Sequence, residues 1–165
     1  MKIQDIMTET VKACHPDANL AEAVALMWEG DCGTLPVVAD GGKLVGILTD
    51  RDIAIALGTQ NKRPSDIQVR EVMAGEVSAC YPGEEIHGAL KTMREEKVRR
   101  LPVVSDEGVL QGIISVNDVA LHAEKIDGHK TTALTYEDLV NTFKAICEHR
   151  HPKEERELSS KTAAQ

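Results

Sequence analysis

GILTDRD, residues 46–52, and GIISVND, residues 112–118, are two versions of one motif. Each reads glycine, isoleucine, an aliphatic residue, a hydroxyl residue, two variable residues and an aspartate. The agreement extends well beyond the motif, because residues 6–53 align without a gap with residues 72–119. Both copies contain the run LPVV in the same register. Self-similarity at a fixed spacing indicates an internal repeat, so the chain is organised as two copies of one unit.

Each copy predicts the same succession of elements. A short strand, residues 10–14 or 76–80, ends at a proline. A helix follows, which Asn19 can cap in the first copy with Glu22 in the first turn. Apolar residues at positions i, i+3, i+4 and i+7 give this helix one buried face. The face consists of Leu20, Ala23, Val24 and Met27 in the first copy and of Ile86, Ala89, Leu90 and Met93 in the second.

The second half of each copy predicts a hairpin and a second helix. LPVV is a continuous apolar run typical of a strand buried on both sides. A glycine-containing turn and a partner strand follow it. The order β-α-β-β-α defines an α/β (α+β) unit, and one such unit buries little surface alone. We therefore expect two units packed about a pseudo-twofold axis and linked by residues 54–71, with boundaries at 1–66 and 67–126 and a C-terminal helix and polar tail at 127–165.

Composition excludes several classes of function. The formal net charge is -8 and aromatic residues make up 2% of the chain, so neither a nucleic-acid surface nor a base-stacking platform is expected. No apolar run reaches the ~18 residues of a membrane span, and the N-terminus lacks the features of a signal peptide. A cytoplasmic location with reduced cysteines is the default expectation. No motif of a nucleophile, phosphate loop or metalloprotease occurs, so we expect no enzyme.

The hydroxyl-x-x-Asp element has two physical interpretations. Thr49 with Asp52, and Ser115 with Asp118, fit capping boxes that only start a helix. The same geometry suits a ligand, because a helix N-terminus favours a phosphate and a carboxylate one turn in can accept hydrogen bonds from ribose hydroxyls. The residues alone leave both interpretations open.

Together these pieces resemble a known family. The repeat is similar to a CBS domain, named after cystathionine beta-synthase, and the pair resembles a Bateman module. The matching pieces are IMT and VMA, LPVV twice, the glycine-to-aspartate motif twice, and VRRLPVV, over roughly residues 1–125. The segment 138–147 is also similar to the C-terminal part of small stand-alone bacterial two-CBS proteins. The resemblance implies a regulatory module that binds adenosine-containing ligands between its repeats.

The resemblance implies two unequal clefts, each built from both repeats. In the first, the Asp118 cleft, Asp118 contacts the ribose, Ser115 lies near phosphate and Ile113 flanks the adenine. The rest of this cleft is formed by Cys32, Gly33, Thr34, Arg99, Arg100 and Asn117. The other, the Asp52 cleft, takes Asp52, Thr49, Ile47, Arg51, Thr34 and the backbone of Val98 to Arg100. Because Arg99-Arg100 replaces Gly33-Thr34 in the second repeat, we expect the Asp118 cleft to be the stronger phosphate site. The alternative for the arginines is a solvated pair balanced by neighbouring glutamates.

Two further features each have a purely structural and a functional interpretation. Cys147-x-His149-x-His151 resembles metal-ligand spacing, but alternate residues on a helix diverge, and surface histidines are the simpler account. Cys14 and Cys80 occupy equivalent positions and suit buried apolar sites, although a redox or zinc role stays open. Residues 135–149 predict an amphipathic helix that starts at Thr135 or Tyr136. Its apolar face either packs on its own module or meets a partner subunit, and consists of Leu139, Val140, Phe143, Ile146 and Cys147.

The resemblance therefore implies a non-catalytic sensor of AMP, ADP, ATP or S-adenosylmethionine that changes shape on binding. The expected partners are a homodimer partner, which the resemblance also implies, and an unknown protein target, and no cofactor, nucleic acid or membrane is expected. The alternatives are a structural or stress-associated dimerisation module with unoccupied clefts, or a switch based on cysteine or metal chemistry.

Overall fold

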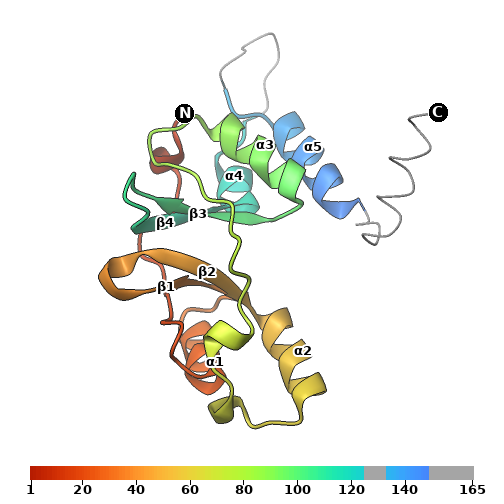
Figure 1. Cartoon of the computed structure of the whole chain (residues 1–165). Coiled ribbons are helices and arrows are strands. Elements are labelled where there is room, and N and C mark those ends of the chain that lie inside the picture. Colours follow the sequence, from red (N-terminus) through yellow and green to blue (C-terminus); the bar gives the residue numbers. More distant parts are fainter. Residues whose placement is uncertain (125–132, 149–165) are drawn as a thin grey trace, which may run out of the picture.

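The computed structural model describes residues 1–124 and 133–148 (Figure 1). In each repeat a helix precedes a two-stranded hairpin and a second helix follows it. The first repeat holds α1 Leu20–Glu29, β1 Thr34–Val38, β2 Leu44–Thr49 and α2 Asp50–Gln60. The second holds α3 Ile86–Glu96, β3 Arg100–Val104, β4 Leu110–Ser115 and α4 Val116–His122, and α5 Tyr136–Cys147 follows. Single 3₁₀ turns lie at Ile3–Asp5, Asp40–Gly42, Pro64–Asp66 and Val69–Glu71.

The two hairpins lie next to each other in the middle of the molecule (Figure 1). Helices α1 and α2 lie beyond the first hairpin, and α3, α4 and α5 lie beyond the second. Both hairpins are antiparallel and share one register, in which Leu35 pairs with Leu48 and Leu101 pairs with Ile114. The LPVV strands are buried as predicted, and the mixed α/β architecture is confirmed. None of the helices in the described part is long and apolar enough to cross a membrane.

The strands predicted over residues 10–14 and 76–80 are wrong in extent. Each is a single parallel bridge, at Cys14 to Val37 and at Cys80 to Val103. At Cys14, the N–H donates to the Pro36 carbonyl, and the Cys14 carbonyl accepts from the Val38 N–H. A further bridge before Cys14 would need an N–H on residue 36, and a further bridge after Cys14 would need an N–H on residue 16. Both residues are proline, which has no N–H. Pro16, which follows the predicted strand, and Pro36, in the neighbouring LPVV strand, therefore limit the pairing to one bridge.

The helix face predicted in the first repeat is only partly buried. Its counterpart in α3 is fully buried at all four positions, whereas Val24 in α1 remains 44% exposed. The connection between repeats also differs from the prediction, because α2 extends to Gln60 and the segment after it enters the core. Ile67 and Val69 are fully buried against the first repeat.

The repeats exchange their leading segments. Ile3 and Ile6, at the start of the chain, lie in the apolar cluster of the second repeat. Isolated bridges record the exchange in symmetric pairs: Thr8 to Ile113 matches Ala74 to Ile47, and Lys2 to Glu85 matches Gln68 to Asn19. Lys43 and Val109, equivalent positions, bridge to each other. This pattern is what a pseudo-twofold axis passing between Lys43 and Val109 produces.

The motif glycines allow this exchange. A Cβ on Gly112 would lie 2.7 Å from the Thr8 carbonyl oxygen, and a Cβ on Gly46 would lie 2.9 Å from the Ala74 carbonyl oxygen. Contacts this short do not occur for real side chains. Only glycine therefore lets the two crossing segments, the chain at Thr8 and the chain at Ala74, pair with the strands of the other hairpins. The first residue of the repeated motif therefore serves the assembly of the two repeats.

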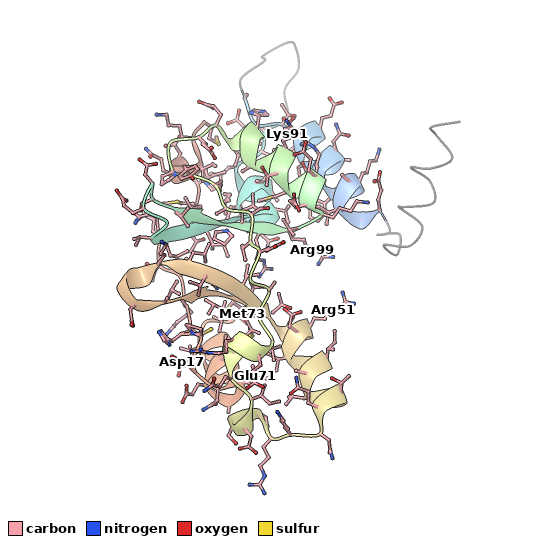
Figure 2. The ribbon with its side chains drawn as sticks, in the orientation of Figure 1. Asp17, Arg51, Glu71, Met73, Lys91 and Arg99 are labelled. Carbon is pink, nitrogen blue, oxygen red and sulfur yellow. The ribbon has the colours of Figure 1, made fainter. Side chains whose placement is uncertain are left out.

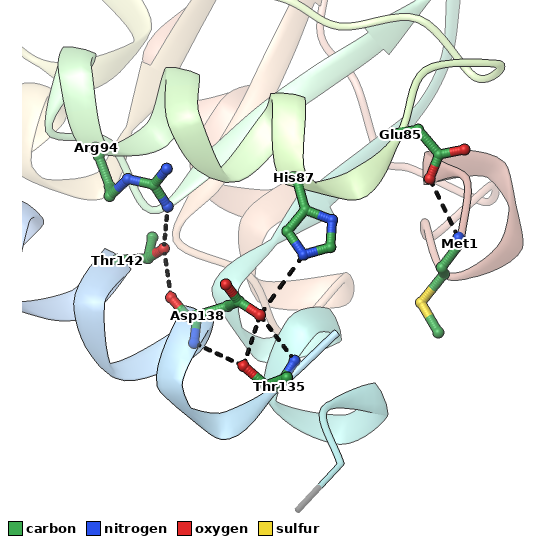
Figure 3. A network of polar contacts seen from close by, with 7 residues as sticks. All are labelled: Met1, Glu85, His87, Arg94, Thr135, Asp138 and Thr142. Carbon is green, nitrogen blue, oxygen red and sulfur yellow. Dashed lines mark hydrogen bonds and ion pairs between the residues drawn. The ribbon is translucent and has the colours of Figure 1, made fainter. Parts of the chain in front are cut away.

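Helix α5 packs on α3 and α4, and a polar network joins it to α3 (Figure 3). Its cap is the Thr135 hydroxyl, which accepts from the Asp138 N–H at 3.1 Å. Arg94 of α3 donates to Oγ1 of the buried Thr142 at 3.1 Å, and His87 Nε2 lies 3.6 Å from Asp138 Oδ2. Burial acts to raise the pKa of Asp138, but the hydrogen bonds from Thr135 and the proximity of His87 outweigh it and lower that pKa.

The apolar residues of α5 form two faces, so the single face predicted from the sequence is wrong. Leu139 and Ile146 pack on the second repeat. Val140, Phe143 and Cys147 point away from it and are exposed.

Candidate functional site

The repeated motif ends each hairpin in a capping box. Ser115 Oγ accepts from the Asp118 N–H at 3.3 Å, while Asp118 Oδ2 accepts from the Ser115 N–H at 2.8 Å and from its hydroxyl at 2.6 Å. Thr49 and Asp52 repeat this geometry at 3.2, 3.0 and 2.6 Å. The capping interpretation is therefore confirmed at both sites. In each box all contacts to the carboxylate use Oδ2, and no described residue hydrogen-bonds to Oδ1.

A cleft of about 660 Å³ opens in front of the second box, between the two repeats. It brings together most of the residues predicted for the Asp118 cleft. From the second repeat come residues of β3, β4 and α4, and from the first come the segment before α1 and the end of α1 with the loop to β1. The lining residues are Thr8, Thr10, Val11, Lys12, Gly30, Asp31, Cys32, Gly33, Thr34, Arg100, Ile113, Ser115, Asn117 and Asp118.

The wall opposite Asp118 is the loop of residues 31–33. Asp31 adopts a left-handed conformation with φ 45°, as does Lys97 at the equivalent position of the second repeat. A Cβ added at Gly33 would lie 2.7 Å from the Asp50 carboxylate. The Gly33 carbonyl accepts a hydrogen bond from the Asp50 N–H. The loop is therefore held from behind by the start of α2.

Two basic and two acidic side chains face the cleft. Arg100 comes from β3, opposite Ser115 in the hairpin, and Lys12 comes from the crossing segment, where it also lies 3.5 Å from Glu29. Asp31 and Asp118 supply the negative charge. Arg99, predicted alongside Arg100, does not line this cleft, and its side chain is exposed.

Sequence reasoning missed the crossing segment, residues 8–12, and the pair Gly30 and Asp31. Of these residues only Thr8 belongs to a quoted motif, the IMT of residues 6–8, and Lys12 has Ser78 as its repeat equivalent. Residues 8–12 reach the cleft because the chain crosses from one repeat to the other at the bridge between Thr8 and Ile113. Gly30 and Asp31 directly precede the predicted Cys32 in the loop before β1.

The residues predicted for the Asp52 cleft occupy the positions related to the first cleft by the pseudo-twofold axis. Ile47 pairs with Ala74, in the segment that crosses to the first repeat, and Val98 packs against the apolar cluster of the second repeat. Arg51 and Arg99 lie on the same side of the molecule in Figure 2. The hollow of about 230 Å³ that includes Asp52 is a different one, between α2 and the residues Glu71 and Val72. Ligand roles at Asp52, Thr49, Arg51, Ile47 and Val98 therefore stay predictions.

The cysteines differ in environment. Burial raises the pKa of the Cys14 thiol to about 11 and that of the Cys80 thiol to about 12. Cys32 is half-buried in the cleft wall and Cys147 is exposed. Within residues 1–124 and 133–148 no group of three His, Cys, Asp or Glu side chains could hold a metal ion. His149 and His151 lie outside the described residues.

Comparison with known proteins agrees with this geometry. A model of the CBS domain matches residues 3–59 and 69–125. The chain belongs to the CBS domain family. The CBS domain-containing protein YhcV of Bacillus subtilis is 37% identical to this CBS pair over 120 residues, which cover 73% of the pair's chain and 84% of YhcV. Hypoxic response protein 1 of Mycobacterium tuberculosis is 31% identical over 144 residues, which cover 87% of this chain and 92% of that protein.

Two solved structures resemble the CBS pair closely. Hypoxic Response Protein I, with two coordinated zinc ions, superposes with a TM-score of 0.68 at 32% identity, over 75% of this chain and 100% of that one. The CBS domain pair of protein MJ0100, in complex with 5'-methylthioadenosine and S-adenosyl-L-methionine, superposes with a TM-score of 0.66 at 27% identity. That match covers 73% of this chain and 94% of the other.

Proposed function

We propose that this CBS pair is a non-catalytic regulatory module that binds an adenosine-containing ligand in the Asp118 cleft. The observation that carries the proposal is the cleft itself, which collects residues from both repeats around one carboxylate. A ligand seated there touches both repeats at once, so its binding can change how they sit against each other.

The chemistry of the cleft fits the two ends of such a ligand. Asp118 Oδ1 can accept hydrogen bonds from ribose hydroxyls, because the helix cap uses only Oδ2. Ile113 provides an apolar surface for the adenine, and the backbone of residues 32–34 provides polar groups for its edge. Arg100 and Lys12 provide positive charge for a phosphate or for the carboxylate of S-adenosylmethionine. The relative that carries 5'-methylthioadenosine and S-adenosyl-L-methionine supports the adenosine class.

The second candidate is a structural or stress-associated module whose clefts stay empty. The capping boxes favour it, because they give both aspartates a role without any ligand. A switch based on cysteine or metal chemistry is a third candidate, suggested by the zinc ions of the related Hypoxic Response Protein I.

Thermal unfolding and titration calorimetry with AMP, ADP, ATP, S-adenosylmethionine and 5'-methylthioadenosine test the proposal. A ligand that binds only the folded state at about one hundred times its Kd stabilises by ~2.7 kcal/mol, which raises the unfolding midpoint measurably. GMP and GTP serve as controls with the same phosphates and sugar. If no adenosine compound shifts the unfolding midpoint, the result favours the structural module. If only zinc or an oxidant shifts it, the result favours the cysteine or metal switch.

The output of the module is part of the same proposal. A ligand that prefers one of two conformations tenfold shifts their equilibrium by ~1.4 kcal/mol. The signal then passes to a protein target or through a homodimer interface. A homodimer in a cytoplasmic setting, with the target unnamed, is the arrangement we propose.

A further inference from the structure

A long apolar groove runs between α1 and α2 on the first repeat. It measures about 520 Å³ and contains Trp28, which at 86% is the most exposed large apolar side chain among the described residues. Val24 also lies here, with 44% of its surface exposed. The residues that line the groove are Val24, Met27, Trp28, Asp31, Cys32, Gly33, Asp50, Ile53, Ala54 and Leu57. An exposed apolar surface of this kind indicates a contact with another molecule or segment.

The pseudo-twofold axis shows what kind of element fits it. The equivalent surface of the second repeat, between α3 and α4, is covered by α5. Under that cover Leu90 is fully buried, whereas its equivalent Val24 is not. Arg94, the equivalent of Trp28, binds Thr142 of α5. The groove on the first repeat therefore has the form of a helix seat without a helix from the described residues.

The outward face of α5 has the pattern of a helix that packs on two sides. Tyr136, Val140, Phe143 and Cys147 follow one another at spacings of four, three and four residues. Tyr136 and Val140 are about half exposed, at 52% and 50%. An apolar stripe at these spacings is typical of a helix that packs along another helix. Because α5 already packs on the second repeat through Leu139 and Ile146, the stripe is available for a second surface.

Charges agree with the pairing and give it a direction. On the second repeat, the C-terminal end of α5 lies at Lys97, whose Nζ is 3.5 Å from Glu148 Oε2. Asp31 occupies the equivalent place in the groove, and Asp50 lines the groove as well. Lys144 lies beside the outward stripe near the same end of α5. A helix seated in the groove in the same direction thus brings a basic residue to the acidic end.

We propose that the outward stripe of α5 from a second copy of this chain fills the α1–α2 groove, and that the exchange is reciprocal. A chain's own α5 cannot do so, because it lies at the opposite end of the molecule from α1 and α2 (Figure 1). Two reciprocal contacts close into a twofold dimer, whereas one-way contacts would build an open chain. The inference rests on the proposed homodimer and names the surfaces that form it.

Sedimentation velocity and light scattering on the full chain test the arrangement. Trp28→Glu in the groove and Phe143→Glu on the stripe are each expected to convert the dimer to monomer, with at least a tenfold weaker association. Leu121→Glu is the matched control, since Leu121 is 82% exposed on α4 and belongs to neither surface. Circular dichroism and the unfolding midpoint confirm that each variant folds.

The pattern of results over the two variants decides the matter, and a dimer that survives both changes overturns the inference. Loss of the dimer in both variants, with partial recovery when the two are mixed, supports reciprocal exchange, because the mixed pair keeps one intact contact. Loss only in Trp28→Glu would show groove-to-groove pairing, and loss only in Phe143→Glu would show α5-to-α5 pairing; either overturns the inference and leaves the homodimer. A monomeric wild type, or an open chain of copies, overturns the closed dimer. Ligand binding by the wild-type chain is a separate readout that reports on the proposed function, whatever the two variants do to the dimer.

Discussion

At the scale of single residues, the proposed function gives Asp118 both of the tasks that the sequence presented as alternatives. Its Oδ2 accepts the N–H and the hydroxyl of Ser115, which fixes the side chain at the start of α4. Asp118 also lines the cleft, and its other oxygen accepts no hydrogen bond from a described residue. If that oxygen binds a ligand as proposed, little entropy is lost on binding, because the cap already orders the carboxylate.

Replacing Asp118 with asparagine separates the two tasks. The amide side chain keeps one oxygen for the cap but lacks the second carboxylate oxygen and the charge. Because hydrogen bonds to a charged group contribute about 1.5–3 kcal/mol, Asp118→Asn should weaken adenosine-ligand binding at least tenfold. The unfolding midpoint should change little, whereas Asp118→Ala should lower it by removing the cap acceptor. Calorimetry and thermal unfolding measure both, and Asp52→Asn, measured beside it, tests the ligand role predicted in the other repeat. Equal affinity for wild type and Asp118→Asn would exclude Asp118 as a ligand.

The cysteines give a prediction about pH. Burial raises the pKa of Cys14 to about 11 and of Cys80 to about 12 from an ordinary value of 9.0, so both stay protonated thiols at neutral pH. Since the thiolate is the reactive form, a thiol reagent at about pH 8 should label exposed Cys147 first and half-buried Cys32 more slowly. Cys14 and Cys80 should react only after unfolding. Mass spectrometry of the labelled chain identifies the order, and early labelling of Cys80 would contradict it.

The same shifts predict how stability changes in alkali. The unfolded chain ionises these thiols near pH 9.0, before the folded chain does. Their contribution to stability is therefore complete below that pH and declines as pH rises toward 11 and 12. Urea unfolding at a series of pH values measures the decline, and Cys80→Ala should reduce its slope.

At the scale of elements, prolines and glycines decide what the hydrophobic pattern leaves open. The pattern correctly predicted the hairpins, α1, α3 and the capping boxes, because these depend on neighbours in sequence. It overestimated the strands at residues 10–14 and 76–80, because their length depends on whether a distant partner has an N–H to donate. Pro36 and Pro102 lack that N–H, and only the pairing seen in three dimensions makes their effect clear.

We expect that the pairing of the N-terminal segment with β4 requires glycine at position 112, the first residue of the motif. Gly112→Ala places a Cβ 2.7 Å from the Thr8 carbonyl oxygen and 3.1 Å from Met7 Sδ, so the crossing segment must shift. We expect a loss of about 1–3 kcal/mol in the free energy of unfolding, measured by urea titration. Gly88→Ala is the matched control, because nothing lies within 4 Å of a Cβ at that helical position. It should instead stabilise by up to ~1 kcal/mol, and similar effects of the two changes would contradict the close approach.

At the scale of the whole molecule, the exchanged segments explain why the sequence predicted only part of the cleft. The resemblance to the CBS family implied that Asp118, Ser115, Ile113, Arg100 and the loop 32–34 share one cleft, and the structure brings them together. Lys12 and Thr8 required knowledge of where the chain crosses, and Asp31 belongs to no motif. The sequence could not predict that α5 has two apolar faces, because a helical pattern shows which residues are apolar but not which surface covers each of them.

The cleft and the groove share a wall, through which the proposed ligand binding and the proposed dimer would be coupled. Asp31, Cys32 and Gly33 line both spaces, and Asp50 of the groove lies against Gly33. A helix seated in the groove bears on α2 and, through Asp50, on the loop that faces Asp118. Any preference of the ligand for one position of this loop is then also a preference for the dimer or the monomer.

Linkage makes the consequence quantitative. If dimerisation changes the ligand Kd by some factor, the ligand must change the dimer association by the same factor for each site. We expect the monomeric variant Trp28→Glu to bind the ligand with an affinity that differs about fivefold or more from wild type, although Trp28 does not line the cleft. Calorimetry on wild type, Trp28→Glu and the dimeric control Leu121→Glu measures one side, and sedimentation with and without ligand measures the other. Unequal factors would indicate a further coupled step, and identical affinities would mean that the loop 31–33 is too rigid to carry a signal between the two sites.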